Sequence, residues 1–290
     1  MNKILYLFFS VFLLDACAQD LDSKLVKTVN TAIHSTKDSS AINEKGTTIE
    51  TRFQVPEGYS RTKNQENSFG AYLQSLPLKP HNSEVLIYNG RIKENLNVYD
   101  AVVDLEIGKR DLHQCADALM RLRAEYLWKN HRYDEIHFNF TNGFRVDYSE
   151  WMKGRRIIVN GNKTSWSNRI APSNTYEDFW KYMEIIFSYA GTLSLSKELE
   201  SIDIQKIKIG HVFIQGGSPG HAIIVVDMAK NSEGKKMFLL AQSYMPAQEI
   251  QILKNPSNLN SPWYSISDNG ILSTPEWQFY NDDLKKFLDY

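Results

Sequence analysis

Three apolar segments in the last third of the chain constrain its fold more than any other feature. They read IKIGHVFIQGG (Ile207–Gly217), HAIIVVDMAKN (His221–Asn231) and KKMFLLAQSYMP (Lys235–Pro246). Short runs rich in β-branched and aromatic residues, bounded by glycine and polar turns, are typical of strands. The segment Ser232–Lys236 has the composition of a hairpin turn between the last two. The pattern predicts an antiparallel meander.

Helical patterns come before these strands. The clearest is RDLHQCADALMRLRAEYLWKN (residues 110–130), in which Asp111 fits the N-cap and Gln114, three residues later, completes a capping box. A second helix is expected from Thr175 to a C-terminal cap at Gly191. Helices that are followed by a meander predict an α+β fold.

The first 17 residues have the features of a targeting segment. The apolar stretch ILYLFFSVFLL follows Lys3 and is shorter than the roughly 20 residues that span a bilayer. It ends in LLDAC, which resembles a bacterial lipoprotein signal with Ala16 before Cys17, although Asp15 is unusual there. The resemblance implies diacylation of Cys17 and attachment to a lipid bilayer of the cell envelope, at the outer membrane or cell surface. An ordinary secretory signal and an uncleaved anchor are the alternatives.

The rest of the chain divides into two parts. Residues 18–50 are rich in Ser, Thr, Asp, Lys and Asn, which predicts a flexible tether. Residues 51–290 contain no repeat or low-complexity block and are expected to form a single globular domain. The formal net charge is −1 and no cluster of Lys and Arg is visible in the sequence, so nucleic acid is not expected as a partner.

A cysteine and a histidine are the candidate catalytic residues. Cys115 is the only thiol left if Cys17 carries lipid. The capping box places Cys115 in the first turn of a helix, where backbone N–H groups favour a thiolate. His221 starts a strand and is the candidate general base, and Gln242 on the next strand is the candidate orienting group. Asp227 is a poorer partner because it lies six residues further along the strand of His221.

The glycine-rich turn GGSPG before His221 is the candidate substrate-binding segment. Its residues Gly217, Ser218 and Gly220 would let a substrate backbone approach. The turn precedes a strand and lacks the Lys-Ser/Thr of a phosphate loop. The alternative for Cys115 is a structural role as a small, buried apolar residue. The alternative for His221 is a structural role as a histidine that is hydrogen-bonded at a strand edge.

No metal or cofactor is expected. His113, Cys115 and Asp117 are two residues apart, so on a helix they point to different sides and make poor joint ligands. His211 and His221 could face each other on adjacent strands, but no HExxH or CxxC spacing supports a metal site.

The order of Cys115 on a helix, His221 on a strand and Gln242 on the next strand resembles the papain-like fold, and more narrowly the NlpC/P60-type cysteine peptidases. The resemblance covers Asp111–Pro246. It implies an α+β, papain-like core with N-terminal helices packed on an antiparallel sheet, plus insertions, and a thiol hydrolase of amide bonds with those three residues as nucleophile, base and orienting group. His211 stands where that family usually carries Asp.

Four stretches resemble a bacterial lipoprotein family of unknown function, DUF4846. They are CADALMRLRAEYL, YAGTLSL, GGSPGHAIIVVDMA and LLAQSYMPAQ. Because the family has no established activity, two hypotheses stay open. The first is a membrane-anchored cysteine hydrolase, acting on a cell-wall or other peptide. The second is a non-catalytic lipoprotein that binds a glycan or peptide on the same fold.

Overall fold

The computed structural model describes residues 41–288. The predictions for Cys17, for the targeting segment and for most of the tether fall outside the described residues. The predicted end of the tether at residue 50 is wrong, because the compact unit begins at Ala41 and Ile42 pairs with Phe53 in a β-bridge. Within residues 41–288, no helix has the length and apolar character needed to cross a bilayer.

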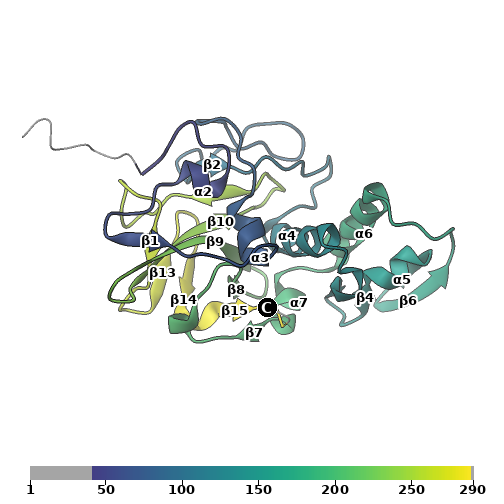
Figure 1. Cartoon of the computed structure of the whole chain (residues 1–290). Helices are drawn as coiled ribbons and strands as arrows, with labels where there is room; N and C mark the ends of the chain where they lie inside the picture. The colour runs from purple at the N-terminus through teal and green to yellow at the C-terminus, as the bar shows by residue number, and fades with distance from the viewer. Residues whose placement is uncertain (1–40, 289–290) are drawn as a thin grey trace, which may run out of the picture. The chain divides into compact units, whose positions relative to one another are not determined.

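The described elements alternate between helices and short strands (Figure 1). The helices are α2 (Ile49–Arg52), α3 (Phe69–Gln74), α4 (Cys115–Lys129), α5 (Tyr148–Met152), α6 (Tyr176–Tyr189) and α7 (Thr192–Glu198), with 3₁₀ turns η1 (Tyr133–Glu135), η2 (Ile204–Lys206) and η3 (Asn281–Asp283). The strands are β1 (Tyr59–Arg61), β2 (Tyr99–Val102), β3 (His137–Asn139), β4 (Arg145–Asp147), β5 (Arg155–Asn160), β6 (Lys163–Asn168), β7 (Glu200–Ser201), β8 (Val212–Gln215), β9 (His221–Asn231), β10 (Lys236–Gln242), β11 (Gln251–Leu253), β12 (Tyr264–Ser265), β13 (Ile271–Ser273), β14 (Gln278–Tyr280) and β15 (Leu284–Lys286).

The main sheet contains the predicted meander at its centre. Its strand order is β2-β11-β10-β9-β8-β15-β7, with β1 also paired to β9 and β12 to β10. Strands β8, β9 and β10 are the three predicted segments, and they pair antiparallel in sequence order. The remaining pairs are antiparallel as well, and the sheet is open. The chain is therefore a mixed α/β fold built on a mostly antiparallel sheet, as the helix-then-strand pattern predicts.

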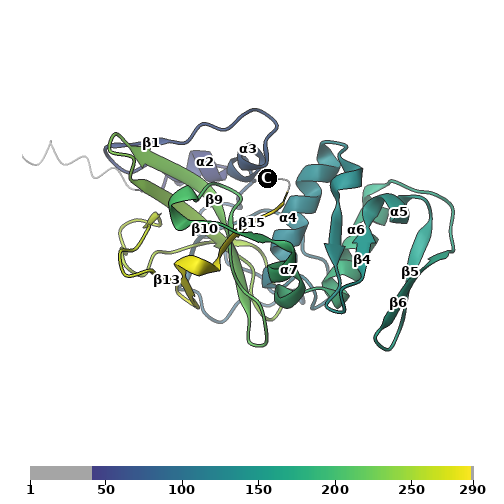
Figure 2. The ribbon, with the colours of Figure 1, turned by 90° about the horizontal axis from the view of Figure 1, so that it is seen from below.

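Strand β9 is apolar without alternation because both of its faces are covered. On one face, the rings of Phe213 and Phe238 lie 6.4 Å apart and Phe279, from the C-terminal segment, lies 6.1 Å from Phe213. On the other face, Asp227 of β9 accepts a hydrogen bond of 2.6 Å from Gln74 in α3. Figure 2 shows β13 and the helices α3 and α4 on opposite sides of β9 and β10. A strand buried on both faces reads as a continuous hydrophobic run.

Helix α4 lies between the main sheet and a second group of elements, α5, α6 and the hairpins β3–β4 and β5–β6 (Figures 1 and 2). All of its residues from Cys115 to Leu127 are buried. Two of its buried charges pair within the helix, since Arg121 Nε donates to Glu125 Oε1 at 2.9 Å. A helix that is buried all round needs no single apolar stripe.

The start of α4 differs from the predicted one. Its first helical residue is Cys115 and its N-cap is Gln114, so the predicted cap at Asp111 is wrong. The Gln114 side chain donates to Asp111 Oδ1 at 3.1 Å, and the Gln114 backbone N–H donates to Asp117 Oδ2 at 3.0 Å. Asp117, not Gln114, therefore occupies the third position of the capping arrangement. Gly191, the predicted C-cap of α6, is instead the N-cap of α7.

Candidate functional site

Cys115 opens onto a pocket at the N-terminus of α4. The pocket has a volume of about 460 Å³, and Gly217, Ser218 and Gly220 line it together with Cys115. The thiol residue itself is 7% exposed. The structure thus brings the predicted nucleophile and the three predicted binding residues to one pocket.

The turn that lines this pocket is fixed by α7. Thr192, the first residue of α7, donates from Oγ1 to the Gly217 carbonyl at 3.2 Å. A Cβ on Gly220 would lie 2.5 Å from that same hydroxyl and 2.7 Å from the Gly217 carbonyl oxygen. Glycine is required at 220 because the turn packs against α7, a reason that differs from the predicted approach of a substrate backbone.

A chain of hydrogen bonds runs behind His221. His221 Nε2 lies 2.9 Å from Gln242 Oε1, Gln242 Nε2 donates to Glu276 Oε2 at 2.7 Å, and Lys93 Nζ donates to Glu276 Oε1 at 2.8 Å. Gln242 is thus the hydrogen-bond partner of His221. Asp227 instead accepts hydrogen bonds from Arg61 and Gln74.

The direction of this chain fixes the tautomer of His221. A carboxylate accepts only, so the Gln242 NH₂ group must face Glu276 and its oxygen must face His221. The imidazole therefore carries its proton on Nε2. Nδ1 is left as the acceptor, and it makes no hydrogen bond to any residue within 41–288.

Aromatic rings enclose the imidazole. The ring centres of Tyr244, Trp277 and Phe279 lie 5.0, 5.3 and 5.9 Å from that of His221. His221 is 1% exposed, and it is not among the residues that line the pocket of Cys115. The imidazole is therefore held in one orientation by packing as well as by Gln242.

Burial keeps both candidate catalytic groups neutral. It raises the pKa of the Cys115 thiol to about 11, and the nearby Asp117 carboxyl adds to this increase. The backbone N–H groups of Ala116 and Ala222 act in the opposite direction and favour the thiolate. Burial lowers the pKa of His221 to about 4, against the opposing hydrogen bond from Gln242. The predicted thiol pKa below its ordinary value is wrong, because desolvation outweighs the helix N-terminus.

Cys115 and His221 lie at the same end of β9 without a hydrogen bond between them. The Ala222 N–H that faces the thiol belongs to the residue directly after His221. Tyr244 lies near both groups, because its ring contacts His221 and its pKa is raised by burial and then by the proximity of Glu276 and Cys115. Among the described residues, no hydrogen bond joins Cys115 Sγ to the imidazole, so the fold brings the two residues to one end of β9 without joining them by a hydrogen bond.

The residues around Cys115 show no metal-binding arrangement. His113 is fully buried, donates from Nδ1 to the Gln248 carbonyl at 3.4 Å, and has a pKa lowered by burial to about 3. Burial raises the pKa of Asp117 to about 8. Across residues 41–288, no three or more His, Cys, Asp and Glu side chains gather in a way that could hold a metal ion.

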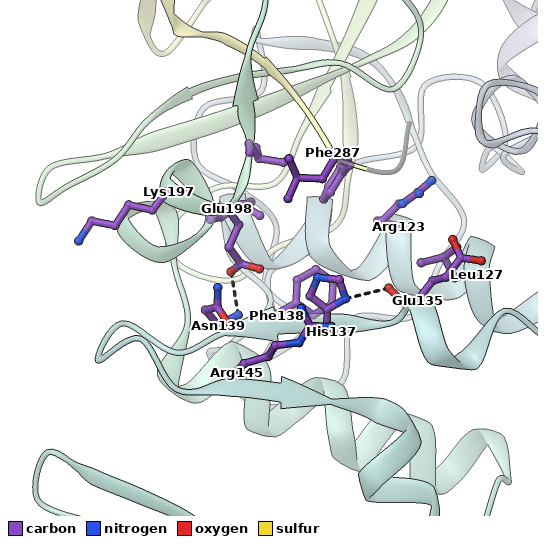
Figure 3. Close-up of a pocket in the computed structure, with 13 residues that line it drawn as sticks. Arg123, Leu127, Glu135, His137, Phe138, Asn139, Arg145, Lys197, Glu198 and Phe287 are labelled. Carbon is purple, nitrogen blue, oxygen red and sulfur yellow. Dashed lines mark hydrogen bonds between the residues drawn. The ribbon is translucent and has the colours of Figure 1, made fainter.

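A separate pocket of about 410 Å³ lies between α4, the β3–β4 hairpin and α7 (Figure 3). Figure 3 shows Glu198 accepting from the Asn139 backbone N–H, a bond of 2.7 Å, and His137 Nδ1 donating to the Glu135 carbonyl at 3.1 Å. Burial raises the pKa of Glu198 to about 7. The described residues that line this pocket include no Cys, Ser or Thr, so it offers no thiol or hydroxyl nucleophile.

Comparison with known proteins identifies the family but no activity. The family described as "Domain of unknown function (4846)" matches residues 49–286, from the start of α2 to the end of β15. No curated protein and no solved structure matches the chain significantly. The match covers the sheet, α4 and the pocket of Cys115, and the chain belongs to the DUF4846 family.

Proposed function

We propose that this protein is a cysteine hydrolase that cleaves an amide bond, on a papain-like core. Cys115 is the nucleophile, His221 the general base and Gln242 the group that orients the imidazole. Glu276 and Lys93 are positioning residues that hold Gln242.

One observation carries this proposal, namely the series of hydrogen bonds from Lys93 through Glu276 and Gln242 to His221. Burying an ion pair beside an amide is costly, and a packed apolar core would stabilise the fold as well or better. These hydrogen bonds fix Nε2 as the protonated nitrogen of His221 and leave Nδ1 as a base. Orienting a catalytic imidazole in this way is what a cysteine–histidine pair requires of its third member.

The proposed reaction starts from the neutral pair. The thiol proton moves to His221 Nδ1 while Cys115 Sγ attacks the amide carbon, and the oxyanion forms beside the N-terminus of α4. The imidazolium then protonates the leaving amine, which departs and leaves a thioester on Cys115. Water loses a proton to Nδ1 and attacks the thioester, and the acid product leaves as the thiol is restored. The first step requires a hydrogen bond between the Cys115 thiol and His221 Nδ1, so the proposed mechanism requires the thiol to approach the fixed imidazole in the complex with substrate.

The pocket and the targeting segment suggest the substrate and the location. Leu193 and Met245 line the rim and are 39% and 53% exposed, which suits a peptide with an apolar side chain. The lipoprotein-like signal supports attachment to the envelope through acylated Cys17, and hence a cell-wall peptide as substrate.

Cys17→Ala is expected to abolish lipid labelling and membrane retention. Equal partition of this variant and the parent into the membrane fraction would contradict the location.

Trapping of the thioester tests the function. The protein is incubated with peptidoglycan-derived peptides, quenched in acid and analysed by intact mass. We expect an acyl adduct on the parent that maps to Cys115, and none on Cys115→Ala. Release of product without any adduct, or at an equal rate from both proteins, would contradict the proposal.

The second candidate, a peptide- or glycan-binding protein, is favoured by the raised pKa of Cys115 and the missing hydrogen bond to His221. In that case the peptides bind the parent and Cys115→Ala with equal affinity, and neither protein releases product. Calorimetry and an assay of product release with the same peptides separate the two candidates, because only the hydrolase releases product.

A further inference from the structure

A groove at the other end of β9 gathers lysines from distant parts of the sequence. It has a volume of about 790 Å³ and lies between the loop after β1, the η2 region and the ends of β9, β10 and β15. The described residues that line it include no Asp, Glu or Arg. We name it the lysine groove after the six lysines that line it, which are Lys63, Lys206, Lys208, Lys230, Lys236 and Lys286.

Most of this charge has no counter-charge nearby. Lys286 faces Glu200 at 3.4 Å, and Lys236 donates to the backbone carbonyls of Gln205 and Ile207. None of the other four lysines of the groove makes an ion pair with a carboxylate in the described part of the chain. The net charge of the whole protein is −1, so this concentration of positive charge is local.

The lysines repel one another across the groove. The pKa of Lys236 is lowered by burial and then by the charges of Lys230 and Lys208. His211, which also lines the groove, has a pKa lowered to about 4 by burial and then by Lys208, Lys286 and Lys236. Like charges held together in this way are relieved by a bound anion.

The chemistry of the groove selects the kind of anion. Lysine binds phosphate as a point charge, whereas arginine is preferred where a carboxylate is held by two parallel bonds. A concave site of this volume is in the range of small-molecule pockets, and a flat bilayer cannot enter it. Apolar side chains of Ile202, Ile207, Ile209 and Met228 between the lysines give the ligand a partly apolar floor.

We propose that the lysine groove binds a small ligand that carries several phosphate groups. The site is distinct from the pocket of Cys115, since Lys230 and His221 are about 30 Å apart along β9 at the rise of an extended strand. It does not depend on the proposed hydrolase activity.

Titration calorimetry with sodium tripolyphosphate tests the site. We expect binding by the parent at low salt that weakens at about 0.15 M salt, because four of the six lysines are exposed and their charges are screened. Lys208→Gln combined with Lys230→Gln should weaken binding by at least about tenfold. The side chains of both lysines are exposed and form no hydrogen bond to a backbone group of the described residues, so the variant should fold. Lys153→Gln combined with Lys163→Gln, on the far side of α4, is the matched control and should bind like the parent.

Three outcomes would overturn the proposal. They are no binding of tripolyphosphate, an equal loss in the control variant, and binding of hexaglutamate as tight as that of tripolyphosphate. Binding to vesicles of phosphatidylglycerol without binding of tripolyphosphate would also reject a groove for small ligands. Bound ligand should in addition raise the pKa of His211, measured from its ring resonances, because it offsets the charges of the surrounding lysines.

Discussion

His221→Ala is expected to lower the rate of amide hydrolysis by about 10²–10⁴-fold, the usual contribution of a general base. The loss should appear in kcat/KM with little change in peptide affinity, since His221 does not line the pocket of Cys115. His81→Ala removes a histidine that faces Glu44 at 3.7 Å, outside both the pocket and the His221 chain, and serves as the control. A parent-like rate in His221→Ala would remove His221 from the mechanism.

The pH profile of the parent follows from the same residue. The pKa of His221 is lowered to about 4, so its base form is present throughout the neutral range and is lost only as the pH falls towards 4. The thiol, with a pKa raised to about 11, stays protonated over that range. We therefore expect kcat/KM to be flat near neutrality, with its acid limb well below pH 6.5, the ordinary pKa of histidine. An acid limb at 6.5 would contradict a desolvated base.

Glu276→Gln tests whether Glu276 orients the amide of Gln242 or only packs against it. A glutamine at 276 can present an oxygen or an NH₂ group, so the amide of Gln242 is no longer held in one orientation. When Gln242 turns its NH₂ group towards His221, the ring proton must move to Nδ1, which then cannot accept the thiol proton. We expect a lower rate together with a mixture of ring tautomers, seen in the ¹⁵N shifts of His221. A lower rate with the Nε2 proton unchanged would show that Glu276 acts only on stability.

The central strands and the order of the candidate site follow from local sequence. Three apolar segments with short turns specify β8, β9 and β10, and a polar residue in an apolar strand was enough to identify Gln242 as the partner of His221. The start of α4 differs from its predicted position because Asp111 and Gln114 have capping side chains that bond each other instead of the helix. Local composition cannot tell which of two capping side chains the backbone will use.

The support of the site could not be predicted because it comes from distant segments. Glu276 is 34 residues after Gln242, and Lys93 is 183 residues before Glu276. The segment TPEWQFY (residues 274–280) is notable in sequence for its aromatic residues, yet it is its single carboxylate, Glu276, that orients Gln242. The lysine groove has the same origin, because its members are scattered from residue 63 to residue 286 and form no basic run.

His113→Asn is expected to remove a large part of the acid sensitivity of the fold. His113 is fully buried, and its pKa is lowered from 6.5 to about 3 by burial and then by Arg121. A histidine whose pKa is lowered in the folded state binds its proton more readily in the unfolded chain. Its contribution to stability is therefore complete above pH 6.5 and is lost as the pH falls towards 3. By pH 4 this loss amounts to about 3 kcal/mol.

Asparagine keeps a donor for the Gln248 carbonyl, where His113 Nδ1 now donates, but it does not titrate. The free energy of unfolding, measured with urea near neutral pH and at pH 4, should fall less in His113→Asn than in the parent, by about 3 kcal/mol. His211 and His221, whose pKa values are also lowered, and Asp117 and Glu198, whose pKa values are raised, are present in both proteins and cancel in this comparison.

Leu119→Ala is the matched control for His113→Asn, because it removes a buried apolar side chain of α4 that does not titrate. It should lower the free energy of unfolding by similar amounts at both pH values. An equal pH dependence in His113→Asn and the parent would mean that His113 takes up its proton without unfolding. The buried imidazole beside Phe187 would then have to open to water in the native state, together with the N-terminus of α4 on which Cys115 lies.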